Sequence, residues 1–169
     1  MRYASIRSLD VTNGEGVGVS LFTQGCPFHC HNCFNPDTWD FNGGKEWNED
    51  VEKQFLSLID KPHIKRVSIL GGEPLANQNR HNIFLLCNKI KSTFPTKKIW
   101  LYTGYTFEEI MSVREVVKTL CCIDVLVDGR YIEEERDITL PFRGSKNQRL
   151  IDVKETLRQN QIVLYNTTK

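Results

Sequence analysis

Three of the six cysteines lie close together in the sequence. Cys26, Cys30 and Cys33 have the spacing Cys-x-x-x-Cys-x-x-Cys, and the other three cysteines stand apart. If six cysteines were scattered at random over 169 positions, this spacing would arise roughly 0.007 times. Thiolates are the ligands of structural zinc and of iron-sulfur clusters. A tight thiol group in a chain without export signals therefore indicates metal binding or catalysis.

The number of donors leaves two alternatives. Three thiolates are one fewer than the four that normally close a structural zinc or iron-sulfur site. His29 or His31 could supply the fourth ligand, which would make the chain a zinc-binding interaction module. In the other alternative, one iron of a cluster stays open to a small-molecule ligand, which is the arrangement that chemistry at the metal needs. The rest of the sequence favours this second alternative.

Glycine-rich and polar segments follow four apolar runs of the chain. The cysteine group follows residues 17–22, Gly71-Gly72-Glu73-Pro74 follows residues 66–70, Thr103-Gly104 follows residues 98–102, and Asp128-Gly129-Arg130 follows residues 123–127. Paired glycines let a ligand approach the backbone, and a glutamate accepts hydrogen bonds from an ammonium group. In a parallel α/β sheet, the loops at the carboxyl ends of the strands form the ligand-binding face. We therefore expect these segments to border one site.

The elements that position these loops follow from periodicity. Strands are expected at residues 17–22, 66–70, 98–102, 123–127, 149–153 and 162–165. Helices are expected at residues 47–60 with Asn48 as N-cap, at 79–94 before Pro95, and from the capping box of Thr106 and Glu109 to about residue 120. This alternation predicts one α/β domain over residues 1–169. We expect an open or partial (β/α) barrel with a mostly parallel sheet of about five to six strands, because a closed barrel needs more residues.

Composition and charge argue against several classes of protein. The chain has 22 Lys and Arg against 21 Asp and Glu, so its net charge of +1 gives no electrostatic footprint for nucleic acid or an anionic membrane. It has no apolar run of roughly 20 residues, and its first five residues (MRYAS) do not resemble a secretory signal. We expect a cytoplasmic protein that binds neither nucleic acid nor membrane.

The motifs together resemble the radical S-adenosylmethionine superfamily. The cysteine group after the first expected strand and GGEP after the second carry this resemblance. Four further segments narrow it to the family that activates anaerobic ribonucleoside-triphosphate reductases: 13–16 (NGEG), 100–105 (WLYTGY), 127–130 (VDGR) and 143–148 (RGSKNQ). The resemblance extends from about residue 3 to residue 149.

The resemblance implies a set of cofactors and ligands. A 4Fe-4S cluster would be held by Cys26, Cys30 and Cys33, and its fourth iron would bind the amino and carboxylate groups of S-adenosyl-L-methionine. The other residues implied to contact this cofactor are Gly71, Gly72 and Glu73 at its methionine end, Thr103, Asp128 at the ribose or amino group, and Arg130 at the carboxylate.

The implied activity is that of an oxidoreductase. An electron from a donor such as flavodoxin would cleave S-adenosylmethionine, and the 5′-deoxyadenosyl radical would take hydrogen from a glycine in the glycyl-radical subunit of the anaerobic reductase. The chain departs from related sequences at two positions. Asn32 stands where the superfamily usually has an aromatic residue, so Phe28 and Phe34 are candidates for stacking on adenine, and Gly18 stands where related activases often have arginine.

Two other enzyme classes share the superfamily chemistry. A radical S-adenosylmethionine enzyme of the deazaguanine synthase type would act on a small molecule. An activase of another glycyl-radical enzyme, such as pyruvate formate-lyase, would be longer and would lack the WxYTGY and DGR segments. Together with the zinc-binding interaction module, these are the alternatives to a reductase activase.

Overall fold

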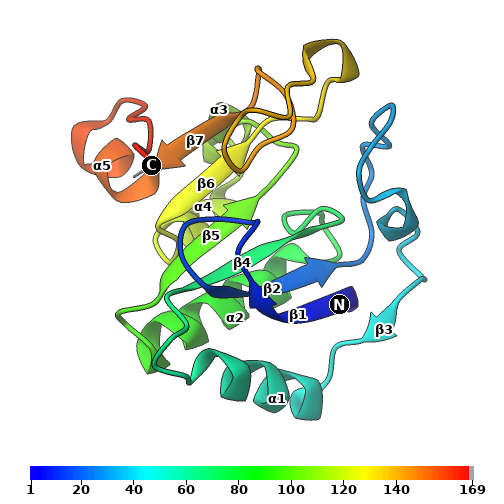
Figure 1. The fold of residues 1–169 in the computed structure, drawn as a ribbon, viewed down its shortest axis with the longest axis vertical. Coiled ribbons are helices and arrows are strands. Elements are labelled where there is room, and N and C mark those ends of the chain that lie inside the picture. The colour runs from blue at the N-terminus through cyan, green and yellow to red at the C-terminus, as the bar shows by residue number, and fades with distance from the viewer. Residues whose placement is uncertain (168–169) are drawn as a thin grey trace.

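Four buried strands form the centre of the sheet in the computed structural model, which describes residues 1–167 (Figure 1). They are β2 (Gly18–Thr23), β4 (Arg66–Gly71), β5 (Lys98–Tyr102) and β6 (Val125–Asp128). These strands pair in parallel, and β2 and β4 are in register from Gly18 opposite Arg66 to Thr23 opposite Gly71. Each of the four was expected from an apolar run, which is typical of strands that are covered on both faces.

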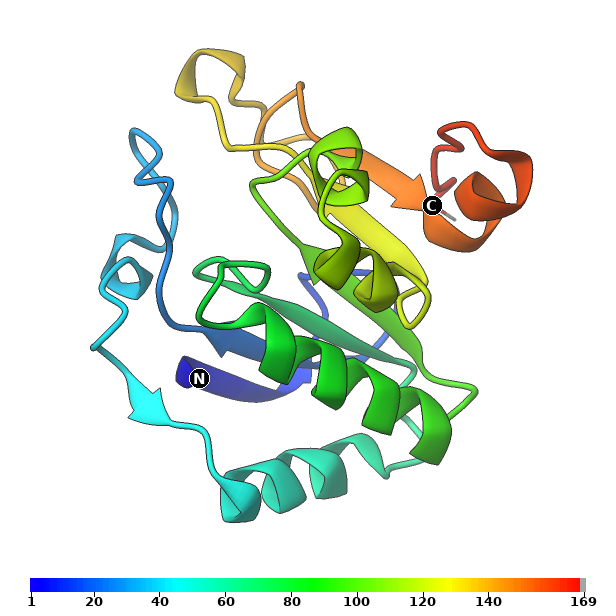
Figure 2. The ribbon, with the colours of Figure 1, turned by 180° about the vertical axis from the view of Figure 1, so that it is seen from behind.

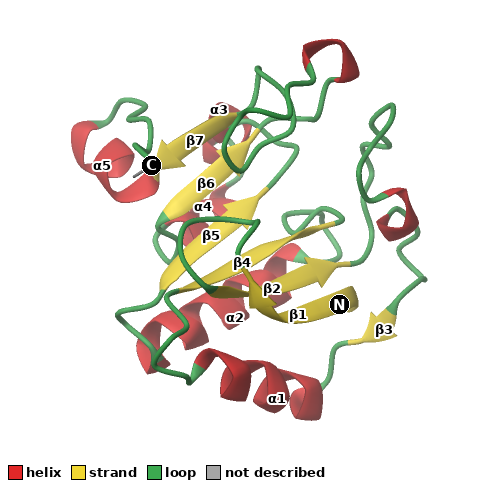
Figure 3. Cartoon of the chain, viewed as in Figure 1, coloured by secondary structure: helices red, strands yellow, loops and turns green. Residues whose placement is uncertain are grey.

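Three further strands extend this centre by antiparallel pairing. They are β1 (Arg2–Asp10), β3 (Lys45–Glu46) and β7 (Arg149–Asp152), which gives the order β3-β1-β2-β4-β5-β6-β7. The edge strands β3 and β7 do not pair with each other within residues 1–167, so the sheet stays open (Figure 3). The α/β class and the open, mostly parallel sheet are confirmed.

The expected number of strands was too low, and one expected strand is wrong. The sheet has seven strands over the described residues, because β1 and β3 were not recognised. Most of β1 is half-buried or exposed, so it lacks the apolar run or strict alternation that marks a strand in sequence. Residues 162–165 form only an isolated bridge between Leu164 and Ile151.

The ends of the helices agree with the capping residues and the proline that the sequence shows. Asn48 accepts a hydrogen bond from Val51 N at the start of α1 (Glu49–Ile59), and α2 (Arg80–Thr93) ends before Pro95. The expected third helix is divided into α3 (Phe107–Met111), which has the predicted capping box, and α4 (Arg114–Leu120). Val113 takes an extended backbone between them and is exposed, so the helical spacing that runs through Val113 was misleading. A short α5 (Val153–Gln159) follows β7.

The helices α1, α2 and α4 cover one face of the sheet (Figure 2). Alternate strand residues, including Leu21, Ile69 and Leu101, face these helices in the main apolar core. The opposite face carries a smaller cluster around Trp100, and Phe142 from a loop packs against it. One face of the sheet is therefore left for a site that is covered by loops. No helix within the described chain is long and apolar enough to cross a membrane.

Candidate active site

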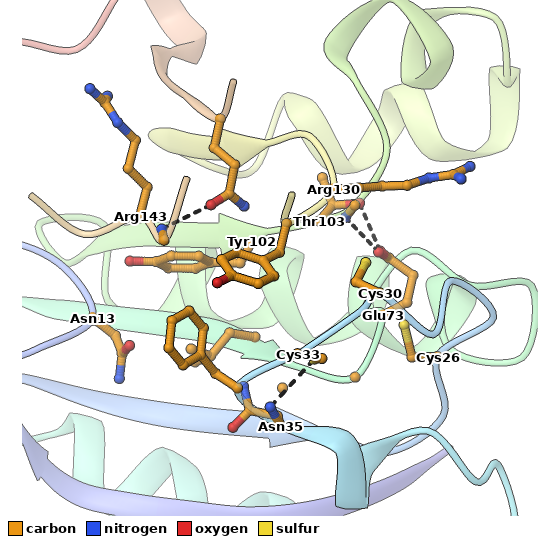
Figure 4. Close-up of a pocket in the computed structure, with 18 of the residues that line it drawn as sticks. Asn13, Cys26, Cys30, Cys33, Asn35, Glu73, Tyr102, Thr103, Arg130 and Arg143 are labelled. Carbon is orange, nitrogen blue, oxygen red and sulfur yellow. Dashed lines mark hydrogen bonds between the residues drawn. The ribbon is translucent and has the colours of Figure 1, made fainter. Parts of the chain in front are cut away.

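A cavity of about 470 Å³ lies at the carboxyl ends of the central strands (Figure 4). Phe22 of β2, Leu70 of β4 and Tyr102 of β5 form part of its wall. Because side chains alternate along a strand, these three residues point away from the helices and into the loop-covered face. The predicted site residues that line the cavity are Cys26, Cys30, Cys33, Gly71, Gly72, Glu73, Thr103 and Arg130.

Backbone hydrogen bonds shape the loop that carries the three cysteines. Cys26 N donates to Trp39 O at 3.0 Å, and Cys33 N donates to Cys30 O at 3.1 Å. His29 and Asn32 adopt left-handed backbone angles, with φ of 48° and 53°. These turns let three thiols from eight consecutive residues border the same cavity.

The three thiols are free and half-buried. Burial raises the pKa of Cys26 to about 11, and the nearby charge of Glu73 adds to this effect. Burial also raises the pKa of Cys30, as does the neighbouring Cys33. A bound cation would reverse this preference, because metal ligation requires the thiolate and offsets its cost of burial.

The two glycines before Glu73 allow the loops to meet. Gly71 has a positive φ of 103°, and a Cβ on Gly72 would lie 2.6 Å from Gly25 O. Glu73 N donates to the same Gly25 oxygen at 2.8 Å. We expected these glycines to admit a ligand. Both line the cavity, and they also bring the backbone after β4 against the residue that precedes Cys26.

Glu73 joins this loop to the one after β5. Its Oε1 accepts from Thr103 Oγ1 at 2.7 Å and from Leu75 N at 2.8 Å, and its Oε2 accepts from Gly104 N at 2.8 Å. Burial raises the pKa of Glu73 to about 7, although the three hydrogen bonds oppose this rise. Since each carboxylate oxygen accepts about two hydrogen bonds, Oε2 retains one acceptor position. Glu73 is therefore both a structural bridge and a ligand candidate.

The loop after β6 places its two predicted ligands differently. Asp128 does not line the cavity, because its carboxylate accepts from Phe107 N at 2.7 Å and from Arg149 Nε at 3.0 Å. The guanidinium of Arg130 lies over the ring of Phe28, 4.3 Å from its centroid. Figure 4 shows the Arg130 side chain extending past Glu73, away from the centre of the cavity. The structure thus brings Arg130 to the site and leaves Asp128 within the fold.

The far end of the cavity contains polar residues that the sequence did not single out as ligands. Asn13, Tyr102 and Arg143 line it together with Phe142. The buried hydroxyl of Tyr102 has no hydrogen-bond partner among the described residues, and burial raises its pKa. The signal for Tyr102 was its position two residues after Trp100 in β5, which places both side chains on the loop-covered face.

A buried arginine supports this end of the cavity. Arg66 of β4 lies opposite Gly18 of β2, and a Cβ on Gly18 would be 2.5 Å from Arg66 Cγ. Arg66 Nη2 donates to Asp10 Oδ1 at 3.2 Å, and Nη1 donates to Ser68 Oγ at 2.6 Å. Ser68 Oγ then donates to Asn13 O at 2.5 Å. The guanidinium from the neighbouring strand thus fills the space beside Gly18, and its network holds Asn13.

Comparison with known proteins agrees with these motifs. Residues 12–151 match the family model described as a 4Fe-4S single cluster domain. Over 150 residues, the chain is 37% identical to the anaerobic ribonucleoside-triphosphate reductase-activating proteins of Vibrio cholerae serotype O1 and Escherichia coli K12, covering 88% of this chain and 96% of each relative. It is 39% identical to the protein of that name from Enterobacteria phage T4, covering 89% of this chain and 93% of the relative.

The chain belongs to this family of activating proteins. The matched region contains the three cysteines, the segment Gly71–Glu73 and most of the loop-covered face. Three cysteine ligands alone allowed either a zinc-binding module or an iron-sulfur cluster. The match to a 4Fe-4S domain family favours the iron-sulfur cluster.

The residues of the cavity fit such a cluster. Its three thiols are the soft donors that iron-sulfur clusters use. Neither histidine of the cysteine loop lines the cavity, and the ring of His29 is stacked on Trp39 at 4.7 Å. Within residues 1–167, no three His, Cys, Asp or Glu side chains are grouped closely enough to hold a single metal ion.

Proposed function

We propose that this chain is a radical S-adenosylmethionine activase that generates a glycyl radical on an anaerobic ribonucleoside-triphosphate reductase. The observation that supports it best is the convergence of three loops. The cysteine loop, the loop of Glu73 and the loop of Thr103 meet at one cavity through direct hydrogen bonds. The relatives are named as activating proteins of such a reductase, which supports this partner.

In this proposal Cys26, Cys30 and Cys33 would hold the cluster and would leave one iron open to S-adenosylmethionine. When bound and reduced, the cluster would supply the electron for cleavage of this cofactor to methionine and a 5′-deoxyadenosyl radical, and this radical would take a hydrogen atom from a glycine of the reductase. A flavodoxin is the proposed electron donor. The low reduction potential that this step needs lies within the range that burial and hydrogen bonds set for such clusters.

The residues of the chain bind and orient the cofactor. Oε2 of Glu73 accepts from an N–H of its amino group, because this oxygen has an acceptor position left. Gly71 and Gly72 leave no side chain at the methionine end. Arg130 binds the carboxylate after a change of rotamer, since a guanidinium pairs with a carboxylate through two hydrogen bonds. Asp128 positions the Gly129–Arg130 turn by fixing Arg149 and the start of α3.

The remaining task of the cavity is to exclude water from the radical. Four aromatic residues line much of the cavity: Phe22, Phe28, Phe142 and Tyr102. The glycine of the reductase would enter through the side of the cavity that stays open. Solvent exclusion by an apolar wall protects a reactive intermediate from side reactions. Docking of the reductase would then complete the site.

The deciding experiment measures two products under anaerobic conditions. The chain is reconstituted with iron and sulfide, reduced, and given S-adenosylmethionine with or without the purified reductase. We expect 5′-deoxyadenosine and, only with the reductase, a glycyl-radical doublet in electron paramagnetic resonance. One equivalent of zinc with no iron, or 5′-deoxyadenosine without a doublet when the reductase is present, would contradict the proposal.

A matched pair of cysteine variants tests the ligands. Cys30→Ala removes a thiol that lines the cavity, and Cys121→Ala removes an exposed thiol outside it. We expect the Cys30 variant to lose most of its iron, since two thiolates cannot hold the 4Fe-4S cluster. Its rate of S-adenosylmethionine cleavage should fall at least about 100-fold. The Cys121 variant should match the unmodified chain in iron content and rate. Equal iron content in both variants would remove Cys30 from the ligand set.

A further inference from the structure

Three large apolar side chains are exposed on the two loops that border the mouth of the cavity. Ile138 is 82% exposed, Phe34 is 59% exposed and Ile132 is 36% exposed. Phe34 comes from the cysteine loop and the other two from the segment after β6, and Phe34 and Ile138 also line the cavity. Figure 1 shows the two loops projecting beyond the sheet at the same end of the molecule. We call Phe34, Ile132 and Ile138 the mouth patch.

The two loops of the mouth patch are packed against each other. The rings of Phe34 and Tyr131 lie 5.0 Å apart, and the guanidinium of Arg136 lies 5.8 Å from the centroid of Phe34. A Cβ on Gly144 would come within 2.8 Å of the Phe34 ring and 3.1 Å of Tyr131. A side chain at position 144 would therefore displace the Phe34 ring from this arrangement.

The segment 143–148 (RGSKNQ) holds the second loop in shape. Gln148 Oε1 accepts from Gly144 N at 2.9 Å, and Gln148 Nε2 donates to Gly129 O at 3.0 Å. Buried Ser145 donates to Asn147 Oδ1 at 2.7 Å and accepts from Ile132 N at 3.2 Å. These hydrogen bonds tie both ends of the loop to one anchor, so the exposed side chains are presented by an ordered surface. Preorganisation of this kind lowers the entropic cost of binding.

We propose that the mouth patch is the docking surface for the glycyl-radical subunit of the reductase, with Ile138 and Phe34 as its apolar anchors. The inference rests on the proposed function, in which a backbone glycine of another protein must reach the cavity. The protein that carries this glycine must cover the mouth. Exposed apolar side chains beside a site mark protein–protein contacts.

The charges around the patch match the anatomy of an interface. Glu133, Glu134 and Arg136 lie between Ile132 and Ile138 in the sequence, and the Arg136 guanidinium lies over Phe34, so charged groups accompany the apolar side chains, as at the rim of an interface. Anchors of this type insert into pockets on the partner and dominate the binding energy. The complementary surface on the reductase is therefore an apolar pocket beside the glycine-bearing loop.

Binding of the complete, iron-loaded chain to the purified reductase tests this inference. The variants are Ile138→Ser, Ile138→Leu and, as a control, Leu85→Ser, which replaces a half-exposed residue of α2 on the other face of the sheet. We expect Ile138→Ser to raise the dissociation constant about tenfold or more, whereas Ile138→Leu and Leu85→Ser should change it less than about twofold. Iron content should stay unchanged in all three, and cleavage of S-adenosylmethionine measured without the reductase separates an effect on the cofactor from an effect on docking.

The outcomes separate this inference from the proposed function. If the unmodified chain binds the reductase and forms the glycyl radical but Ile138→Ser binds equally well, the docking surface lies elsewhere and the proposed function stands. If the unmodified chain neither binds the reductase nor produces the radical, the proposed function and the docking surface are both wrong.

Discussion

Glu73 and Asp10 are both buried carboxylates, yet their pKa values move in opposite directions. Burial dominates at Glu73 and raises its pKa to about 7. Burial also opposes ionisation of Asp10, but hydrogen bonds from the Asn13 side chain and from the backbone N–H groups of Thr12 and Asn13 outweigh it and hold the pKa of Asp10 well below its ordinary value. Asp10 also pairs with fully buried Arg66 at 3.2 Å. The carboxylate of Glu73 thus joins two loops at the cavity, and that of Asp10 joins the end of β1 to β4.

The depressed pKa of Asp10 predicts a pH-dependent effect of Asp10→Asn. A carboxylate with a lowered pKa in the folded state stabilises the fold above its ordinary pKa of about 4, and this contribution is lost as the pH falls. The variant also leaves the charge of Arg66 buried without a counterion. We expect it to lower the free energy of unfolding by about 3 kcal/mol at pH 7, and the difference should shrink below about pH 4.

Denaturant unfolding of the two proteins between pH 3 and pH 7 measures this difference. Asp50→Asn is the control, because Asp50 is largely exposed and its ion pair with Lys53 is weak. A difference between Asp10→Asn and the unmodified chain that stays constant over the whole range would show that ionised Asp10 does not stabilise the fold.

At the scale of elements, the pairing of β2 with β4 depends on a missing side chain. Gly18 stands opposite Arg66, and the guanidinium lies in the volume that a larger residue would fill. The Arg66 network then reaches the segment that ends in Asn13, which borders the cavity. The register of two central strands and the position of one cavity wall are therefore coupled.

Gly18→Ala should disturb this arrangement. Because the added Cβ would lie 2.5 Å from Arg66 Cγ, we expect overpacking to lower the free energy of unfolding by roughly 1–3 kcal/mol. The same substitution in an Arg66→Ala background should cost much less, since the obstructing atoms are gone. Unfolding free energies of the four proteins give the coupling energy. A coupling near zero would mean that Gly18 and Arg66 do not constrain each other.

At the scale of the whole molecule, helices cover one face of an open sheet and loops cover the other (Figures 1 and 2). The loops after β2, β4, β5 and β6 meet around the cavity because parallel strands bring their carboxyl ends to one edge of the sheet. Contacts such as Phe34 with Tyr131 and Arg130 with Phe28 join the cysteine loop to the loop after β6. A cluster bound by the cysteine loop would therefore stabilise more than the residues that hold it.

Removal of the cluster should lower the stability of the whole chain. A ligand that binds only the folded state raises the unfolding midpoint, so the reconstituted protein should melt about 5 °C or more above the chelator-treated protein. S-adenosylmethionine should raise the midpoint further, and only in the iron-loaded form. Anaerobic differential scanning fluorimetry measures these midpoints, with Cys30→Ala as the control that gains nothing from iron. Equal midpoints with and without iron would contradict the coupling of the cluster to the fold.

The sequence by itself determined the features that depend on residues close together in the chain. Asn48, Pro95 and the capping box of Thr106 and Glu109 act within one helical turn, so the helix boundaries there could be predicted. The four central strands are buried on both faces and appear as apolar runs. The cysteine spacing and the glycine-rich segments are likewise short stretches of sequence, so the candidate site could be identified without the structure.

Only the tertiary structure decided the features that join distant residues. Arg66 and Asp10 are 56 positions apart, and Glu73 and Thr103 are 30 apart. Asp128 turned out to pair with Arg149, so its carboxylate is used in the fold and not in the cavity. Strand β1 owes its conformation to pairing with β2 and β3, because its own half-exposed residues carry no strand pattern. Such contacts depend on how strands and loops are brought together in space, which local periodicity and spacing do not encode.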